Sequence, residues 1–486
     1  MPGVAANPAA APDVLLRLLG SEGRPAWRTL CRERDLPGEV IEAILVHPER
    51  GVRGGFARNR HVDPLHRGRL AEDRDPFVRV ALAGGPPAHT GPARPLPDAV
   101  IERLLTARDP DGQSVAVTAD EIREELVGSH QIPQSFRRAA LTHQHPMIRA
   151  FAAGMWIFMT PEQRTALLAD PAPEVQQAVH RHQRLLDPDV VEADLPDPDC
   201  HYRSMLLVNH AISHAVAERC FAEGRGLWAL AGNPSTPYEF VEKLASDPDP
   251  NIRVRVASRC DLDADLLEKL ADDPEAAVRI RAMVHEPPRT EPQRRMIDHV
   301  IGRSADDIGL IHQPFNPPAL EWFAACAVSG HPLLRRIAAT FPLLPDDLVA
   351  RLAHDPDSDV RHLLAYNHPS APPRLLLDAF IAGRRQRPYL LTHPRLPRTG
   401  LAHLLDHEDP DVRALATADP TLPHPPLTHL HDPDPRVRSA AAANPLLPAD
   451  LLAQLLIDPD RAQSAASNAG LTSAQLHGLL DRAGLH

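Results

Sequence analysis

The chain has 486 residues and a formal net charge of −12 at pH 7, which argues against a non-specific nucleic-acid binder, because such proteins normally carry a basic surplus. Its five cysteines are far apart and form no CxxC pair, which argues against a disulfide framework or a cysteine-only zinc site and fits a reducing compartment, the cytoplasm. We find neither the pattern of a secretory signal nor a window of about 18 apolar residues, so we expect no membrane span.

A repeat is clearest in residues 232–281, where the sequence states one pattern twice. A Leu-rich segment leads to an Asp-Pro step, and a hydrophobic-Arg pair, small residues and a turn follow. The two pairs, Ile252-Arg253 and Val278-Arg279, start 26 residues apart. Self-similarity at a period of about 20–50 residues indicates a solenoid. The abundant prolines recur at a fixed spacing from the leucines, which indicates that they mark turns between helices rather than disordered segments.

In chain order, we expect N-terminal repeats over residues 1–85, an insertion or loop within one repeat over 86–120, and a continuous repeat solenoid over 121–486. The spacing of 44 residues between Val78 and Ile122 marks the insertion. Residues 4–19 already match the second half of a repeat. The seventeen repeat starts are Ala26, Val52, Val78, Ile122, Ile148, Val175, Tyr202, Leu227, Ile252, Val278, Ile308, Leu334, Val360, Pro388, Val412, Val437 and Ala462, of which Ile308 and Pro388 match poorly.

Each repeat is predicted to contain one α-helix and one short helical or 3-10 segment. Leucines three and four residues apart mark the helix. We expect capping boxes at residues 160–163 and 236–239, and we expect Asp-Pro to end each helix, since proline disfavours helical geometry in the residue before it. The fold class is therefore an all-α superhelical solenoid of about 17–18 repeats of about 24–28 residues, each too small to bury its apolar face alone.

These motifs resemble the leucine-rich repeat variant family. The matching segments are residues 249–253, 355–361 and 434–445. The resemblance implies an α-helix alternating with a 3-10 helix in a right-handed superhelix, and it implies no particular activity. The pattern is also similar to HEAT repeats, which are longer. One branch of the family carries an N-terminal cysteine cluster for an iron–sulfur centre, and because this chain lacks that cluster we carry over no cofactor.

The second position of the repeat is usually arginine and should form a ladder along the solenoid. One interpretation is structural, with each arginine paired to an Asp-Pro aspartate and joining adjacent repeats. The other is an exposed stripe for phosphate or carboxylate ligands. Tryptophan takes this position twice, and tryptophan is enriched at binding hot spots, although core packing is its commoner use in a solenoid. The candidate binding residues are Trp27, Trp228, Arg253, Arg279, Arg361, Arg413 and Arg438.

Catalytic and metal motifs are missing from the sequence. The 27 histidines suggest metal binding, but no HExxH occurs and no histidine pair has a convincing third ligand. Phosphate-cradling GxxxxGK[ST], dinucleotide GxGxxG and nucleophile-elbow GxSxG patterns are also missing. We therefore predict no catalytic residues, no metal site and no cofactor.

Three functions remain open. The first is a non-catalytic scaffold that binds a protein or peptide partner on its extended face. The alternative is a nucleic-acid-binding HEAT-like solenoid, including one that repairs alkylated bases, and the net charge disfavours this alternative. The third is a small-molecule or metal enzyme with a pocket beside the 86–120 segment.

Overall fold

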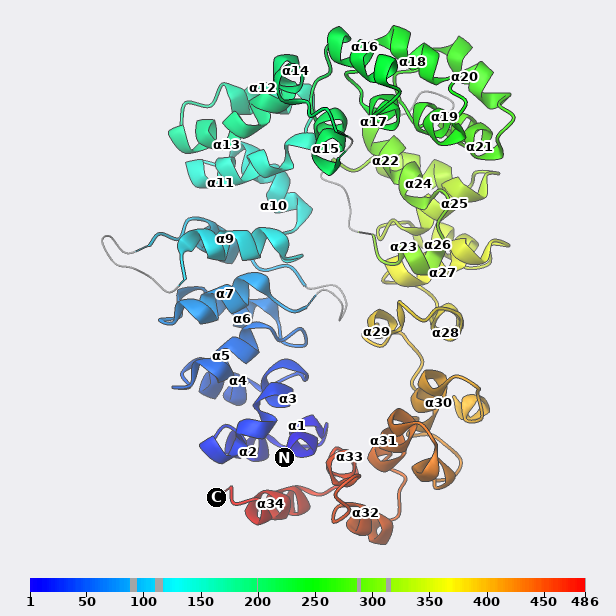
Figure 1. The fold of residues 1–486 in the computed structure, drawn as a ribbon. Coiled ribbons are helices and arrows are strands. Elements are labelled where there is room, and N and C mark those ends of the chain that lie inside the picture. The colour runs from blue at the N-terminus through cyan, green and yellow to red at the C-terminus, as the bar shows by residue number, and fades with distance from the viewer. Residues whose placement is uncertain (88–93, 110–116, 199, 286–289, 312–315, 486) are drawn as a thin grey trace. The chain divides into compact units, whose positions relative to one another are not determined.

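The computed structural model describes residues 1–87, 94–109, 117–198, 200–285, 290–311 and 316–485. Within these ranges every regular element is an α-helix or a short 3-10 helix, written η, and none is a β-strand (Figure 1). The chain divides into two compact units, residues 1–136 together with 372–486, and residues 137–371. The predicted all-α repeat fold is therefore confirmed.

The first unit contains α1 (Pro2–Ala6), α2 (Pro12–Arg17), η1 (Ser21–Ala26), α3 (Trp27–Arg32), α4 (Gly38–Leu45), α5 (Arg50–Ala57), α6 (Pro64–Gly68), η2 (Arg69–Glu72), α7 (Pro76–Gly84), α8 (Asp98–Leu105), α9 (Ala119–Gly128), α28 (Pro373–Ala382), α29 (Arg387–Leu390), η7 (Ala402–Leu404), α30 (Pro410–Thr417), η8 (Thr428–His431), α31 (Pro435–Ala443), α32 (Ala449–Leu455), α33 (Ala462–Ala466) and α34 (Ser473–Arg482). Helix α10 (Gln134–Ala139) crosses the boundary. The second unit contains η4 (Ala140–Thr142), α11 (Pro146–Ala152), η5 (Ala153–Phe158), α12 (Pro161–Leu168), α13 (Pro173–Gln183), η6 (Arg184–Leu186), α14 (Pro188–Asp194), α15 (His201–Asn209), α16 (His214–Glu223), α17 (Leu227–Gly232), α18 (Tyr238–Leu244), α19 (Pro250–Ala257), α20 (Ala264–Ala271), α21 (Ala276–His285), α22 (Glu291–Val300), α23 (Ala305–Ile308), α24 (Leu320–Ala327), α25 (Pro332–Ala339), α26 (Asp346–Leu352) and α27 (Ser358–Asn367).

Helix α19 illustrates how the sequence produces a repeat. The helix begins where the Asp249 carboxylate accepts the N–H of Asn251 at 2.8 Å, with Pro250 at the first helical position. Ile252 and Val256 are four residues apart, so they lie on one face, and both are buried. That face packs between the equivalent helices of the neighbouring repeats, α17 and α21.

Stacking of equivalent helices continues through each unit. In the second unit α15 packs on α17, α17 on α19 and α19 on α21, and the buried residues from Val191 to Ala282 form one continuous apolar cluster. In the first unit the order is α1, α3, α5, α7 and α9 at one end and α30, α31 and α33 at the other. Each repeat thus covers the apolar face of the next, as a solenoid requires.

In several repeats a buried asparagine forms hydrogen bonds with the preceding repeat. The Asn233 amide donates to the carbonyl oxygens of Leu207 and His210 at 2.8 and 2.7 Å. Backbone carbonyls at helix ends have no partner in their own helix, so this side chain satisfies two of them at once. The same pair of bonds to the preceding repeat is made by Asn59, Asn444 and Asn468.

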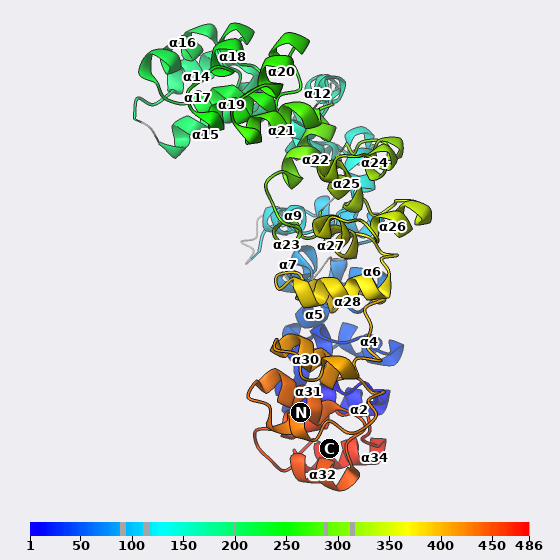
Figure 2. The same ribbon diagram turned by 90° about the vertical axis from the view of Figure 1, so that its right-hand side faces the viewer.

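The two ends of the chain meet within the first unit. Helix α1 packs on α33 and α2 on α34, as both views show for the blue and red segments (Figures 1 and 2). The Asn7 amide donates to the carbonyls of Ala466 and Asn468 at 3.0 and 2.7 Å, and Arg17 pairs with Asp481 at 2.5 Å. Asn7 therefore binds the C-terminal repeat through the same pair of bonds that Asn59, Asn233, Asn444 and Asn468 each make to the repeat before them.

Two local predictions about helix ends are wrong. Asp-Pro begins the following helix rather than ending the previous one, because the aspartate caps the free N–H groups and proline's fixed φ suits the first turn. The capping box at 236–239 is not formed, since Pro237 is the N-cap of α18 and the Thr236 hydroxyl donates to the Leu230 carbonyl at 2.8 Å. The box at Thr160 and Gln163 is confirmed.

The 86–120 segment is not a loop throughout. It contains α8, which buries Ile101, Leu104 and Leu105 and packs on η2 and α9. The sequence around α8 carries the proline and leucine spacing of an ordinary repeat helix, and burial of that apolar face explains why it folds. Residues 88–93 and 110–116 of the predicted insertion lie outside the described residues.

Candidate binding site

Five of the ladder arginines each pair with an aspartate one repeat further along. Arg253 donates from Nε and Nη2 to the two oxygens of Asp273 at 2.7 and 3.0 Å, and the two side chains are only 12% and 7% exposed. Its Nη1 donates to the Asp247 carbonyl at 2.7 Å. The same bidentate pairing joins Arg53 to Asp73, Arg149 to Asp170, Arg335 to Asp355 and Arg413 to Asp432.

Four of these five aspartates also accept a hydrogen bond from a second arginine through their backbone carbonyl, and the fifth, Asp170, accepts one from Gln176 at 3.1 Å. Arg279 Nη1 donates to the Asp273 carbonyl at 2.6 Å, and Arg438 does the same to Asp432 at 2.8 Å. Arg361 likewise contacts the Asp355 carbonyl. Of the predicted binding residues, Arg253 and Arg413 therefore join consecutive repeats through ion pairs. Arg279, Arg361 and Arg438 instead donate to backbone carbonyls five and six residues before them. A role in ligand binding stays a prediction for all five.

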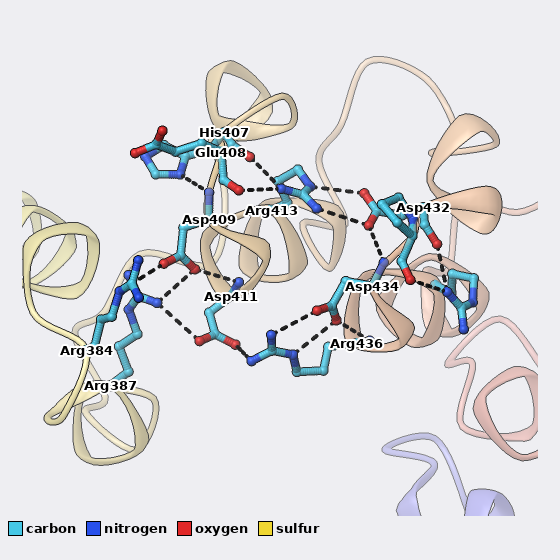
Figure 3. Close-up of polar contacts among 12 residues, drawn as sticks. Arg384, Arg387, His407, Glu408, Asp409, Asp411, Arg413, Asp432, Asp434 and Arg436 are labelled. Carbon is cyan, nitrogen blue, oxygen red and sulfur yellow. Dashed lines mark hydrogen bonds and ion pairs between the residues drawn. The ribbon is translucent and has the colours of Figure 1, made fainter.

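More ion pairs surround the ladder in the first unit (Figure 3). Arg387 Nη1 contacts both Asp409 and Asp411, at 2.8 and 3.1 Å. Arg436 joins Asp411 to Asp434, and the hydrogen bonds that Arg436 donates lower the pKa of Asp434 to about 2. The aspartates here are matched by arginines, so this region offers no surplus of either charge.

The ladder makes stability sensitive to acid. The pKa values of Asp170, Asp273 and Asp432 are lowered, chiefly by the hydrogen bonds that their arginines donate. A carboxyl with a lower pKa in the folded chain stabilises it above the unfolded pKa of about 3.9, and the stabilisation is lost as pH falls through the folded value. We expect the free energy of unfolding to decline below about pH 4, measured by urea titration between about pH 7 and pH 3.

The variant Arg253→Met provides the control for this acid dependence. In this variant the hydrogen bonds from Arg253 no longer lower the pKa of Asp273. The variant should therefore lose less stability than the native chain between about pH 7 and pH 3. Equal losses in the two proteins would contradict the assignment of the acid sensitivity to the ladder.

Trp27 lies within the repeat stack. Its indole Nε1 donates to the Leu18 carbonyl at 3.0 Å, and its ring makes an edge contact with the ring of His47, with centroids 5.6 Å apart. The partly buried side chain therefore connects neighbouring segments of the first unit. A further role for Trp27 in ligand binding stays a prediction.

Trp228 lies one position away from the ladder. Arg53 lies six residues before Asn59, the asparagine of its repeat that binds the preceding repeat, whereas Trp228 lies five residues before the equivalent Asn233. The shift leaves the Trp228 side chain 50% exposed, with the Arg255 guanidinium 4.8 Å from its ring centroid. This cation–π contact places Trp228 beside a pocket that the sequence did not reveal.

That pocket lies in the second unit and has a volume of about 500 Å³. The turns after α15 and α17 form one wall, and α19 and α22 supply charged side chains to another. Four arginines and one glutamate line it, which gives a surplus of three positive charges. The charged lining residues are Arg164, Arg255, Glu291, Arg294 and Arg295.

Glu291 fixes two of these arginines. It accepts hydrogen bonds from Arg294 Nε and Nη2 at 2.9 and 2.8 Å and from Arg295 Nε at 2.8 Å. Burial acts to raise the pKa of Glu291, but the bonds from the two arginines outweigh burial and lower the pKa to about 2. The carboxylate stays ionised near neutral pH and orients the guanidinium groups.

Aromatic rings lie against two of the guanidinium groups, those of Arg164 and Arg295. The Arg164 guanidinium lies 5.7 Å from the Trp156 ring centroid and that of Arg295 lies 5.0 Å from Phe158, which is 44% exposed. Within the described ranges Arg255 makes no side-chain hydrogen bond, and its Nε is buried. Burial, and then the positive charges of neighbouring arginines, lowers its pKa.

Sequence reasoning missed this pocket, although a weak signal was present. Arg255 and Arg281 each follow a ladder arginine by two residues, so they lie on a different helical face from the ladder. Gly232 leaves room for Arg255, because an added Cβ would approach Arg255 Nε to 2.1 Å. Arg294 and Arg295 come from α22, which does not follow the repeat template.

The described residues contain no group of three or more His, Cys, Asp or Glu side chains placed to hold a metal ion. Nor is any helix among them long and apolar enough to cross a membrane.

Comparisons with known proteins do not identify a family. No model of a known protein family matches the chain, and no curated protein matches it either. Among solved structures, the crystal structure of an engineered protein matches at 15% identity over 94% of this chain and 98% of its own, with a TM-score of 0.13. A TM-score that low carries no argument about function.

Proposed function

We propose that this protein is a non-catalytic repeat scaffold that binds an acidic segment of a partner protein in the pocket of the second unit. The observation that carries the proposal is the surplus of three positive charges in that pocket, within a chain of net charge −12. The five widely spaced cysteines and the resemblance to leucine-rich repeat variant proteins fit a scaffold in the cytoplasm.

The chemistry of the pocket suits carboxylates. Arginine presents planar, multiple donors that match a carboxylate, and Arg255 has donors that the described residues leave unused. Arginine and tryptophan are also the side chains that contribute most at protein interfaces, and Trp228 is half exposed next to Arg255. A long nucleic acid would meet the negative charge of the whole chain, which favours a short acidic segment.

Fluorescence anisotropy with a labelled peptide rich in glutamate and aspartate tests the proposal. We expect salt-sensitive binding that a lysine-rich peptide does not reproduce. Arg255→Met and Arg295→Met should each weaken binding about tenfold or more, which corresponds to about 1.4 kcal/mol per tenfold change. A pull-down from lysate with the native chain then identifies the natural partner.

The matched control is Arg351→Met, which removes the same charge from an exposed position on α26 of the same unit. It should leave the affinity nearly unchanged. An acidic peptide that binds Arg255→Met as tightly as the native chain would refute the site. Tighter, Arg255-dependent binding of single-stranded DNA would favour the nucleic-acid alternative instead.

A further inference from the structure

A second basic pocket lies in the first unit, where three consecutive repeats meet. Its volume is about 270 Å³. Helix α3 and the residues after α5 supply its charged lining, and two prolines that follow α7 close one side. The titratable lining residues are Arg28, Arg32, Glu33, Arg58, Arg60 and His61.

Three of these arginines have N–H groups that no protein acceptor among the described residues uses. Glu33 is committed to Arg28, which it contacts at 3.1 Å. In the described part of the chain, the guanidinium groups of Arg32, Arg58 and Arg60 make no hydrogen bond or ion pair, and the Nε of Arg58 is buried without a partner. Four arginines against one glutamate again leave a surplus of three positive charges.

Close packing of the helices holds these cations near one another. A Cβ added at Gly55 of α5 would lie 3.2 Å from the Cys31 Cβ of α3, so the two backbones approach closely there. Burial lowers the pKa of Arg32, and the positive charges of Arg58 and Arg28 lower it further. This arrangement is costly in the empty pocket, and a bound anion would relieve it.

Helix ends explain only part of the arrangement. Arg32 is the last residue of α3 and Arg58 caps the C-terminus of α5. Carbonyl groups at a helix C-terminus favour a nearby cation. That accounts for one cation at each end but not for Arg60, nor for a surplus of three within one pocket.

We propose that this pocket binds a phosphate group, either as free phosphate or as a monoester on a peptide side chain. Guanidinium donors match phosphate oxygens in pairs, and several arginines suit a dianion. The volume is just below the range of about 300–1,000 Å³ typical of small-molecule sites, which suits a small anion. The proposal is independent of the acidic-segment pocket in the second unit.

Isothermal titration of the full chain with inorganic phosphate at low ionic strength is the test. A second arm uses a phosphoserine peptide and its unphosphorylated form. We expect phosphate to bind, and we expect the double variant Arg32→Met/Arg58→Met to lose at least tenfold in affinity. Arg60→Met should weaken binding while leaving the packing between α3 and α5 intact, so it tests the site even if the double variant fails to fold.

Two variants control the experiment. Arg69→Met removes an exposed arginine of the same unit that pairs with Glu42, and it should bind phosphate like the native chain. Arg255→Met in the other unit should do so too, which separates this proposal from the one above. Phosphopeptide binding tighter than phosphate identifies a phosphorylated side chain as the source, and equal binding identifies free phosphate. Absence of binding, equal binding by Arg60→Met, or binding of an oligonucleotide that phosphate does not displace would each overturn the proposal.

Discussion

Replacing Arg253 with methionine is expected to lower the free energy of unfolding by about 3–5 kcal/mol, the cost of removing one partner from a buried ion pair. The Asp273 carboxylate would stay buried, at 7% side-chain exposure, without the two hydrogen bonds it now accepts from Arg253. The Asp247 carbonyl would also lose its donor. Urea unfolding followed by circular dichroism measures the change.

Two further variants test whether the loss of stability comes from the buried charge of Asp273. Arg253→Met/Asp273→Asn removes the uncompensated charge but keeps an acceptor for the Glu275 N–H, so it should recover part of the loss. Arg69→Met breaks an exposed pair with Glu42, at 49% and 60% exposure, and should cost less than about 1 kcal/mol. Similar losses for Arg253→Met and Arg69→Met would show that the ladder is not a structural element.

Replacing Asn7 with alanine should cost about 2–6 kcal/mol, because two buried carbonyls, those of Ala466 and Asn468, would each lose a donor at about 1–3 kcal/mol apiece. The Asn7 side chain is fully buried. Hydrogen exchange should also quicken in α33 and α34, far along the sequence from the substitution. Denaturant unfolding and mass-spectrometric exchange measure the two effects.

Asn444→Ala is the reference for this experiment. Asn444 makes the equivalent two bonds, to Thr417 and Asp419 at 2.8 and 3.0 Å, between repeats that are consecutive in sequence. The two variants should therefore lose similar stability, while Asn251→Ala, at an exposed position, should lose little. A neutral Asn7→Ala beside a costly Asn444→Ala would mean that the contact between the chain ends contributes nothing.

The sequence was most informative where a physical constraint recurs in every repeat. Hydrophobic positions such as Ile252 and Val256 must be buried in each turn of the stack, so their period predicts the architecture. The Asp–Arg pairing could also be anticipated, because buried arginine requires an acidic partner. Asp-Pro was misread because proline restricts the residue before it and also favours the first turn of the helix after it.

The candidate pockets depend on features that a repeat template hides. Trp228 is shifted by one residue from the ladder position of its repeat. The shift can be recognised only once the bonds from Asn233 to the preceding repeat fix the frame of the repeat. The arginines of α22 lie outside any repeat, and their approach to Arg255 is a tertiary contact. In the first unit, Arg32 and Arg58 are 26 residues apart, and only the close approach of helices at Gly55 brings them together.

The bond between Asn7 and Asn468 spans 461 positions, which changes how the chain must be made. Most solenoid contacts are local, so nascent repeats find their neighbours as soon as they leave the ribosome. Asn7 has to wait for Asn468 to be made, on the order of half a minute to a minute and a half at about 5–20 residues per second. Until then the apolar surfaces of α1 and α2 that pack on α33 and α34 stay uncovered, so we expect nascent chains to engage chaperones through α1 and α2 until α33 and α34 have been made.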